Sequence, residues 1–188
     1  MELEDDLAEG KDKTLNRLVA MTVVTLSVFM AVANIKDDNL VQAMQLAKSS
    51  AIDTWSEYQA TRTKAHIVET ARTEMELIAG DHPSAAAKAA FASMDKEAAK
   101  YAAETPKLKK QAQDDDAQYD ALNVHDDQFD MSDALISIAI SLAAVAALAE
   151  TRWLLFTAWG FGVFGLVMGI AGFAGWAIHP DALASFLS

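Results

Sequence analysis

The chain has 188 residues, a formal net charge of −12 at pH 7 and no cysteine. The lack of cysteine excludes disulfides and thiolate metal sites, and the negative charge argues against nucleic acid as a partner. Hydrophobic residues make up 52% of the chain and gather in blocks near both ends, around a polar, alanine-rich middle. This segregation predicts an all-α integral membrane protein.

The N-terminal region predicts one membrane span after an acidic start. Residues 1–17 begin with six acidic side chains among the first twelve positions. Such a composition buries nothing, and we expect this segment to be mobile. Residues 18–35 carry no charge. As a helix they reach roughly 27 Å, which just crosses a bilayer core, so we expect transmembrane helix 1 there.

Residues 36–130 predict a long extramembrane antiparallel helical hairpin. They carry 18 acidic and 11 basic side chains. Good helix formers dominate on both sides of residues 80–83 (Gly-Asp-His-Pro), which supply a helix stop, a turn and a proline that begins the next helix. Further on, the Thr105-Pro106 step should restart or kink the second helix.

The hairpin should bury one stripe from each helix against the other. Large side chains recur on these stripes at helical spacing, and we expect the hairpin interface to contain Trp55, Tyr58, Phe91, Met94 and Tyr101. The remaining stripe positions are mostly alanine, which buries little area. We therefore expect several copies to pack side by side, in the manner of a coiled coil, as a homo-oligomer.

The C-terminal region predicts two further spans joined by a tight reversal. Residues 131–149 and 153–178 are apolar, and Glu150, Thr151 and Arg152 separate them. We expect transmembrane helix 2 over 131–149, transmembrane helix 3 over 153–178 and a short tail over 179–188.

One face of the third span lacks side chains. Steps of three and four residues place four glycines on it: Gly162, Gly165, Gly169 and Gly172. Such a face lets a neighbouring backbone approach closely. The favoured neighbour is the second span, where Ala139, Ala143 and Ala146 form a small stripe. A contact between subunits or a pore lining is the alternative.

Polar groups inside the spans are few. No ionisable residue lies deep in any of the three, which argues against proton-coupled transport. Thr22 and Thr25 share a face of the first span and could line a pore. The ordinary role of such hydroxyls is to bond to their own helix or to join helices.

Sites for chemistry are lacking in the sequence. An acidic collar precedes and enters the second span: Asp114, Asp115, Asp116, Asp126, Asp127, Asp130 and Asp133, with His125 among them. It could gather cations, but it has neither EF-hand spacing nor a glycine turn. No catalytic triad motif, phosphate loop or zinc helix is present. We expect no metal site, no cofactor, no catalytic residue and no enzymatic activity.

Residues 53–60 (Asp-Thr-Trp-Ser-Glu-Tyr-Gln-Ala), with Lys64 downstream, resemble the most characteristic stretch of a bacterial membrane-protein family, the domain of unknown function 4337. The layout is similar over nearly the whole chain. Members have one N-terminal span, a long charged helical segment with an approach like Lys100-Tyr101, and two closing spans with a reversal like residues 151–153. The resemblance implies a bacterial inner-membrane location and this architecture, and it brings no catalytic residues.

Basic residues near the spans indicate the orientation. Lys11, Lys13, Arg17 and Arg152 lie on one side of the predicted topology. This places the N-terminus in the cytoplasm and the hairpin in the periplasm. We expect a non-enzymatic oligomeric scaffold or interaction protein that lies in the lipid bilayer and binds its own copies, or a membrane or periplasmic protein, through the hairpin. A small homo-oligomeric channel with a preference for cations is the alternative.

Overall fold

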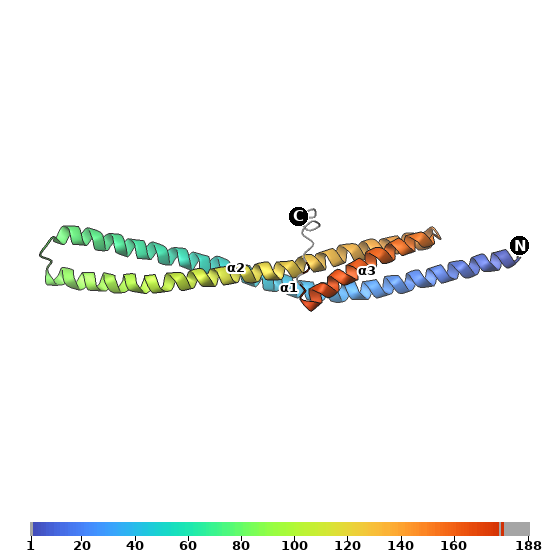
Figure 1. Ribbon diagram of the computed structural model, residues 1–188, viewed down its shortest axis with the longest axis horizontal. Coiled ribbons are helices and arrows are strands. Elements are labelled where there is room, and N and C mark those ends of the chain that lie inside the picture. The colour runs from blue at the N-terminus through green and yellow to red at the C-terminus, as the bar shows by residue number, and fades with distance from the viewer. Residues whose placement is uncertain (1, 177, 179–188) are drawn as a thin grey trace. The chain divides into compact units, whose positions relative to one another are not determined.

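The fold is entirely helical over the residues that the structure, a computed structural model, describes. These are residues 2–176 and 178, with side chains from Lys13 onward. They form three helices and no strand: α1 (Glu2–Ala79), α2 (Ala85–Leu148) and α3 (Arg152–Ala174) (Figure 1). The all-α prediction is therefore confirmed. The tail expected over 179–188 lies outside the described residues.

The ends of α1 and α2 follow local chemistry. α1 begins at Glu2, so its helical backbone includes the acidic start, and it ends before Gly80, whose φ is 60°. Ser84 accepts a hydrogen bond from the backbone N–H of Ala87 (3.2 Å) and caps α2. α2 then continues through Pro106 without the expected restart. Residues on both sides of this proline contact α1, and the tertiary contact holds the helix together across the missing hydrogen bond.

The reversal between α2 and α3 is tight, and α3 ends earlier than expected. Glu150 takes a left-handed conformation with φ of 53°, and Thr151 precedes the first residue of α3. Gly175, with φ of 67°, terminates α3, and the N–H of Trp176 bonds to the carbonyl of Ala171 (3.0 Å). The prediction of a helix to residue 178 was wrong, because glycine at this position favours the left-handed helix stop.

The chain divides into two compact units, and α1 and α2 contribute to both. The three-helix unit is the described part of Met1–Ala43 and Ala121–Ser188, and the helix pair is Met44–Asp120. All three helices are long and apolar enough to cross a membrane. In the three-helix unit, large apolar side chains face outward, and Val24 and Val28 are more than half exposed. Such a surface is compatible with lipid contact.

The core of the three-helix unit draws on all three helices. One cluster joins Leu15 and Val19 of α1 with Ala143 and Ala146 of α2 and with Leu155 and Ala158 of α3. A second cluster centres on Leu26, Ile136 and Ala139, and a third on Ala33, Leu40 and Phe129. Small alanines alternate with larger side chains, so the helices approach closely along their shared length.

The helix pair is packed at one end only. Its two segments run in opposite directions side by side (Figure 1), and contacts join Thr54 to Asp115 and Arg72 to Asp95. Its buried residues repeat at steps of three, four and seven on α1, with one counterpart on α2: Met44, Ala47, Ala51, Thr54, Thr61 and Ala112. No residue from 62 to 111 is buried. The distal half of the pair thus has seam residues but no closed core.

Candidate functional site

A close contact between helices lies at the glycine face of α3. Gly162, Gly165, Gly169 and Gly172 are all buried. A Cβ atom on Gly165 would lie 3.1 Å from the carbonyl oxygen of Ser132 and 3.2 Å from the backbone nitrogen of Ile136. The backbones of α2 and α3 therefore meet directly, and no side chain fits between them.

The neighbours of this face come from two helices. A Cβ on Gly169 would lie 2.7 Å from the ring of Phe29 on α1 and 2.7 Å from Oγ of Ser132 on α2. Gly172 meets the ring of Phe129 in the same way. Of the alanines expected opposite the glycines, Ala139 lies beside Gly162, whereas Ala143 and Ala146 pack against Leu155 and Ala158. Two of the four glycines, Gly169 and Gly172, receive aromatic rings, which a search for small stripes does not detect.

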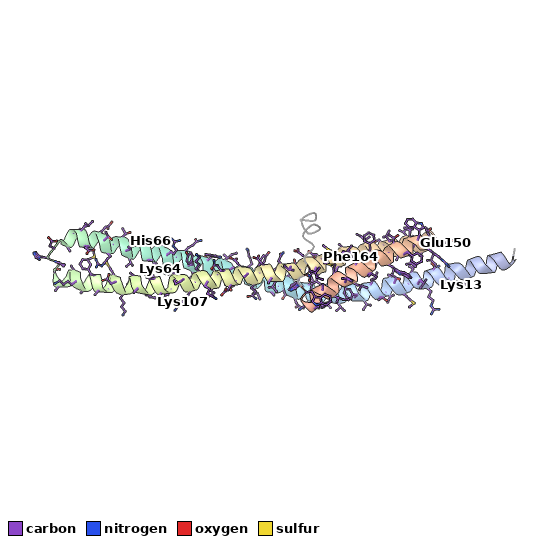
Figure 2. All side chains as sticks on the ribbon, in the orientation of Figure 1. Lys13, Lys64, His66, Lys107, Glu150 and Phe164 are labelled. Carbon is purple, nitrogen blue, oxygen red and sulfur yellow. The ribbon has the colours of Figure 1, made fainter. Side chains whose placement is uncertain are left out.

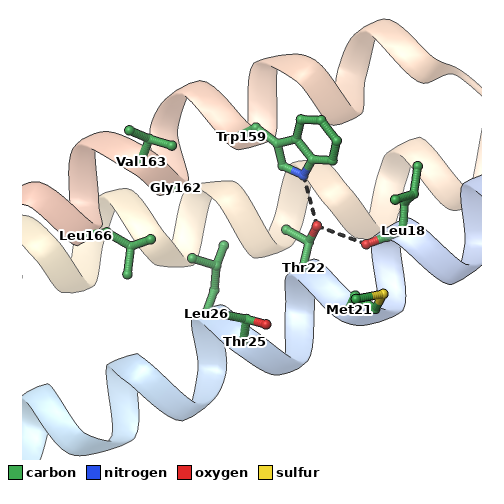
Figure 3. A pocket seen from close by; sticks show the side chains of 9 residues that line it. All are labelled: Leu18, Met21, Thr22, Thr25, Leu26, Trp159, Gly162, Val163 and Leu166. Carbon is green, nitrogen blue, oxygen red and sulfur yellow. Dashed lines mark hydrogen bonds between the residues drawn. The ribbon is translucent and has the colours of Figure 1, made fainter.

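Thr22 and Thr25 line an apolar groove between α1 and α3 (Figure 3). The Thr22 hydroxyl donates to the carbonyl of Leu18 (2.9 Å) and accepts from the indole N–H of Trp159 (2.9 Å). Leu26, Val163 and Leu166 complete the apolar lining around Gly162. The hydroxyl thus joins two helices, and the groove around it offers few polar groups to an ion or to water.

A buried polar network ties α2 to the end of α3. Gln128 and Ser132 are fully buried. The side-chain N–H groups of Gln128 donate to the carbonyls of Trp176 (2.7 Å) and Ile178 (2.6 Å), and Ser132 donates to the carbonyl of Gly165 (2.8 Å). Burial of these polar groups is tolerated because each is hydrogen-bonded, Gln128 to carbonyls beyond the helix stop and Ser132 to a carbonyl within α3. Sequence reasoning missed Gln128, whose only signal is an uncharged amide within an acidic stretch.

The acidic side chains of the collar have different partners. Asp115 accepts hydrogen bonds from Ser50 and Thr54, and Asp116 accepts one from the Trp55 indole (2.8 Å). Asp114 pairs with Lys110. These acids therefore serve the helix pair. No group of three or more His, Cys, Asp or Glu side chains suited to a metal ion occurs among the described residues.

A second group of carboxyls lies in the three-helix unit, beyond the predicted 18–35 span. Burial, and then the charges of Asp126, Asp130 and Asp38, raise the pKa of Asp37 to about 6. Burial likewise raises the pKa of Asp126, with which Asp37 shares a side-chain hydrogen bond. Oδ1 of Asp37 is buried without a partner among the described residues. Such an oxygen disfavours the charged carboxylate, so this contact between α1 and α2 retains a proton more readily than an exposed aspartate.

The expected hairpin residues lie along the seam of the helix pair. Trp55 packs edge-on against Tyr58 (ring centroids 5.5 Å apart). The Arg72 guanidinium lies 4.5 Å from the Phe91 ring centre and pairs with Asp95. Trp55, Tyr58, Phe91, Met94 and Tyr101 are all partly buried. Their buried portions face contacts within the pair, and none of the five is a wholly exposed anchor.

A polar groove crosses the two helices of the pair. Its charged lining consists of Glu57, Lys64, Lys100, Glu104 and Lys107, and Tyr101 lies among them. Figure 2 labels Lys64 on one helix and Lys107 on the other. Cations and anions alternate here, and Lys100 lies 3.9 Å from Glu104. The groove is therefore nearly balanced in charge and has no concentrated field for an ionic ligand.

The sequence model of one family matches most of the chain. This family is described as a domain of unknown function, DUF4337, and the match covers residues 15–175. The chain belongs to this family. The DUF4337 match includes α3, most of α1 and all of α2, so it spans both the three-helix unit and the helix pair. The comparisons with curated proteins and with solved structures gave no match.

Replacement of Gly169 by leucine should loosen the three-helix unit. Even the first added carbon would lie 2.7 Å from the Phe29 ring and from Ser132. Overpacking of this kind costs about 1–3 kcal/mol, so the thermal unfolding midpoint in mild detergent should fall by several degrees, as measured by circular dichroism. The control is Gly160→Leu on the same helix, where nothing lies within 4 Å of the added carbon. Equal midpoints for the two variants would contradict the close contact.

Acidification should stabilise the contact between Asp37 and Asp126. Because the folded-state pKa of Asp37 is about 6 against an ordinary 3.8, the folded state binds the proton more tightly. The contribution of Asp37 to the free energy of unfolding is fully present below about pH 4 and is lost as the pH rises through 6. Thermal unfolding between pH 4.5 and 7.5 should show this trend, and Asp37→Asn should flatten it. Asp81→Asn, at an exposed position in the turn after α1, is the control, and an unchanged slope in Asp37→Asn would refute the assignment.

Proposed function

We propose that this DUF4337 protein is a non-enzymatic membrane protein whose helix pair lies outside the bilayer and associates with further copies. The observation that carries the proposal is the open distal half of the pair, where no residue from 62 to 111 is buried. Two helices that bury so little are marginal alone, because tertiary packing supplies most of a helix's stability. A neighbouring copy would supply the missing packing surface.

The membrane anchor in this proposal is the three-helix unit. Its three apolar helices and its exposed valines support the insertion of this unit into a membrane. The lysines and arginine before the first span, together with Arg152, support a cytoplasmic N-terminus and a periplasmic helix pair in a bacterial inner membrane. The protein would then act as a scaffold that positions copies of itself, or a membrane or periplasmic partner, at the membrane surface.

The channel alternative draws less support from the contacts. The Thr22 hydroxyl is bonded to Trp159, and the glycine face is filled by Phe29, Ser132 and Phe129. A pore would need a further polar surface in the spans. Because the described residues offer no metal-binding group and the sequence no catalytic motif, we favour association over chemistry.

Membrane topology can be tested with single cysteines, since the natural chain has none. A cysteine at Ala85 should react with an impermeant maleimide added to intact spheroplasts. A cysteine at Thr151 should react only after the membrane is opened. Labelling of both from the same side would overturn the three-span arrangement and its orientation.

The number of subunits separates the scaffold from the channel. Native mass spectrometry in mild detergent should show a dimer or another small assembly. A strictly monomeric protein would contradict self-association, since the open helix pair would then be complete by itself. A closed ring of five or more subunits would favour the channel, and ion flux in liposomes would be the next measurement.

A further inference from the structure

The face of α1 that points away from α2 in the helix pair is exposed and poor in charge. Between Gln45 and Thr73, the rows of this helix farthest from the seam comprise thirteen exposed positions, of which only Asp53 and His66 are ionisable. The other exposed charged residues of this stretch lie on the rows that flank the seam: Lys48, Glu57, Arg62, Lys64 and Glu69. Three large apolar side chains on it are more than half exposed: Leu46 (73%), Ile52 (57%) and Ile67 (62%). The solvated face of a helix in a two-helix seam normally carries many charges, so this composition calls for a partner surface.

Several hydroxyl groups on this outer face bond to carbonyls of their own helix. Ser56 donates to the carbonyl of Ile52 (2.8 Å), and Thr63 donates to that of Gln59 (2.9 Å). A hydroxyl bonded in this way can be covered by another protein surface at little desolvation cost. The central row of the face consists of the small residues Ser49, Ser56, Thr63 and Thr70, which would permit a second helix to approach closely.

The outer face of α1 is also hollowed. A shallow depression on it is lined by Thr63, His66, Ile67, Thr70, Ala71 and Glu74, and Figure 2 labels His66 on this segment. The hollow lies beside the exposed Ile67 side chain. A ridge and a hollow next to each other on one helix face are what two identical faces need in order to interlock.

The outer face of α2 differs in charge. Its exposed positions include four lysines: Lys96, Lys100, Lys107 and Lys110. Lys100 and Lys110 lie beside Glu104 and Asp114. If two copies met through this face in parallel, Lys96 and Lys107 would approach their own counterparts, and the like charges would repel. On the outer face of α1, the central row contains no charge, and Asp53 and His66 occupy its flanking rows.

We propose that the outer face of α1 is the homodimer interface, where it packs in parallel against the same face of a second copy about a twofold axis. The inference rests on the proposed function, because copies inserted in one membrane share one orientation and must therefore pair in parallel. Parallel pairing brings each residue near its own counterpart, which is favourable for an uncharged face and unfavourable for the lysine-bearing one. The seam residues Trp55 and Tyr58 remain within each copy.

Disulfide cross-linking of single-cysteine variants in membranes tests this interface. Ser56→Cys and Thr63→Cys, in the central row of the outer face, should form covalent dimers on mild oxidation. Ala103→Cys, at the corresponding exposed row of α2, is the matched control and should remain largely monomeric. Cross-linking of Ala103→Cys as strong as that of Thr63→Cys would overturn the assignment of the face.

A charge insertion gives a second readout without oxidation. Ile67→Lys should shift the native mass spectrum from dimer to monomer while helical content by circular dichroism stays unchanged. Ala99→Lys, which adds the same charge to an exposed position of α2, should leave the dimer intact. A dimer that persists in Ile67→Lys refutes this interface but leaves self-association standing, whereas a monomeric wild-type protein refutes both.

Discussion

The three-helix unit depends on the absence of side chains along one face of α3. At Gly165 and Gly169 an added carbon would meet backbone or ring atoms within about 3 Å, so the neighbouring elements lie where a side chain would otherwise be. Phe29 of α1 and Ser132 of α2 both reach this face. The same contact thereby sets the spacing of all three helices and brings Gln128 within reach of the carbonyls beyond the helix stop.

The helix pair is held together by other contacts. Its proximal seam closes around alanine and threonine, and specific polar bonds from Asp115 and Asp116 reinforce it. Distally the seam is only partly covered, and arginine over an aromatic ring replaces a buried core. A surface that packs on the distal half would stabilise it, and the proposed association with further copies rests on this low burial.

The DUF4337 family match extends over both units of the structure. The family match covers both the apolar helices and the charged pair, so the combination is a property of the family domain as a whole. The titrating contact of Asp37 with Asp126 belongs to the three-helix unit, whereas the charge-poor outer face of α1 belongs to the helix pair. Each unit thus carries its own testable feature.

The sequence by itself determined the helical class, the three apolar segments, the turn after Ala79 and the glycine face, because periodicity, charge and helix-stop residues are local properties. It also placed Trp55 and Tyr58 on a seam. It misjudged the end of α3, where a single glycine decided the outcome. At Pro106, where a restart or a kink was expected, α2 continues as one helix. Only the tertiary structure showed that Phe29 fills the glycine face, that Gln128 bonds beyond α3 and that Asp37 meets Asp126. These contacts join residues far apart in the chain, and no local pattern specifies which side chains will meet.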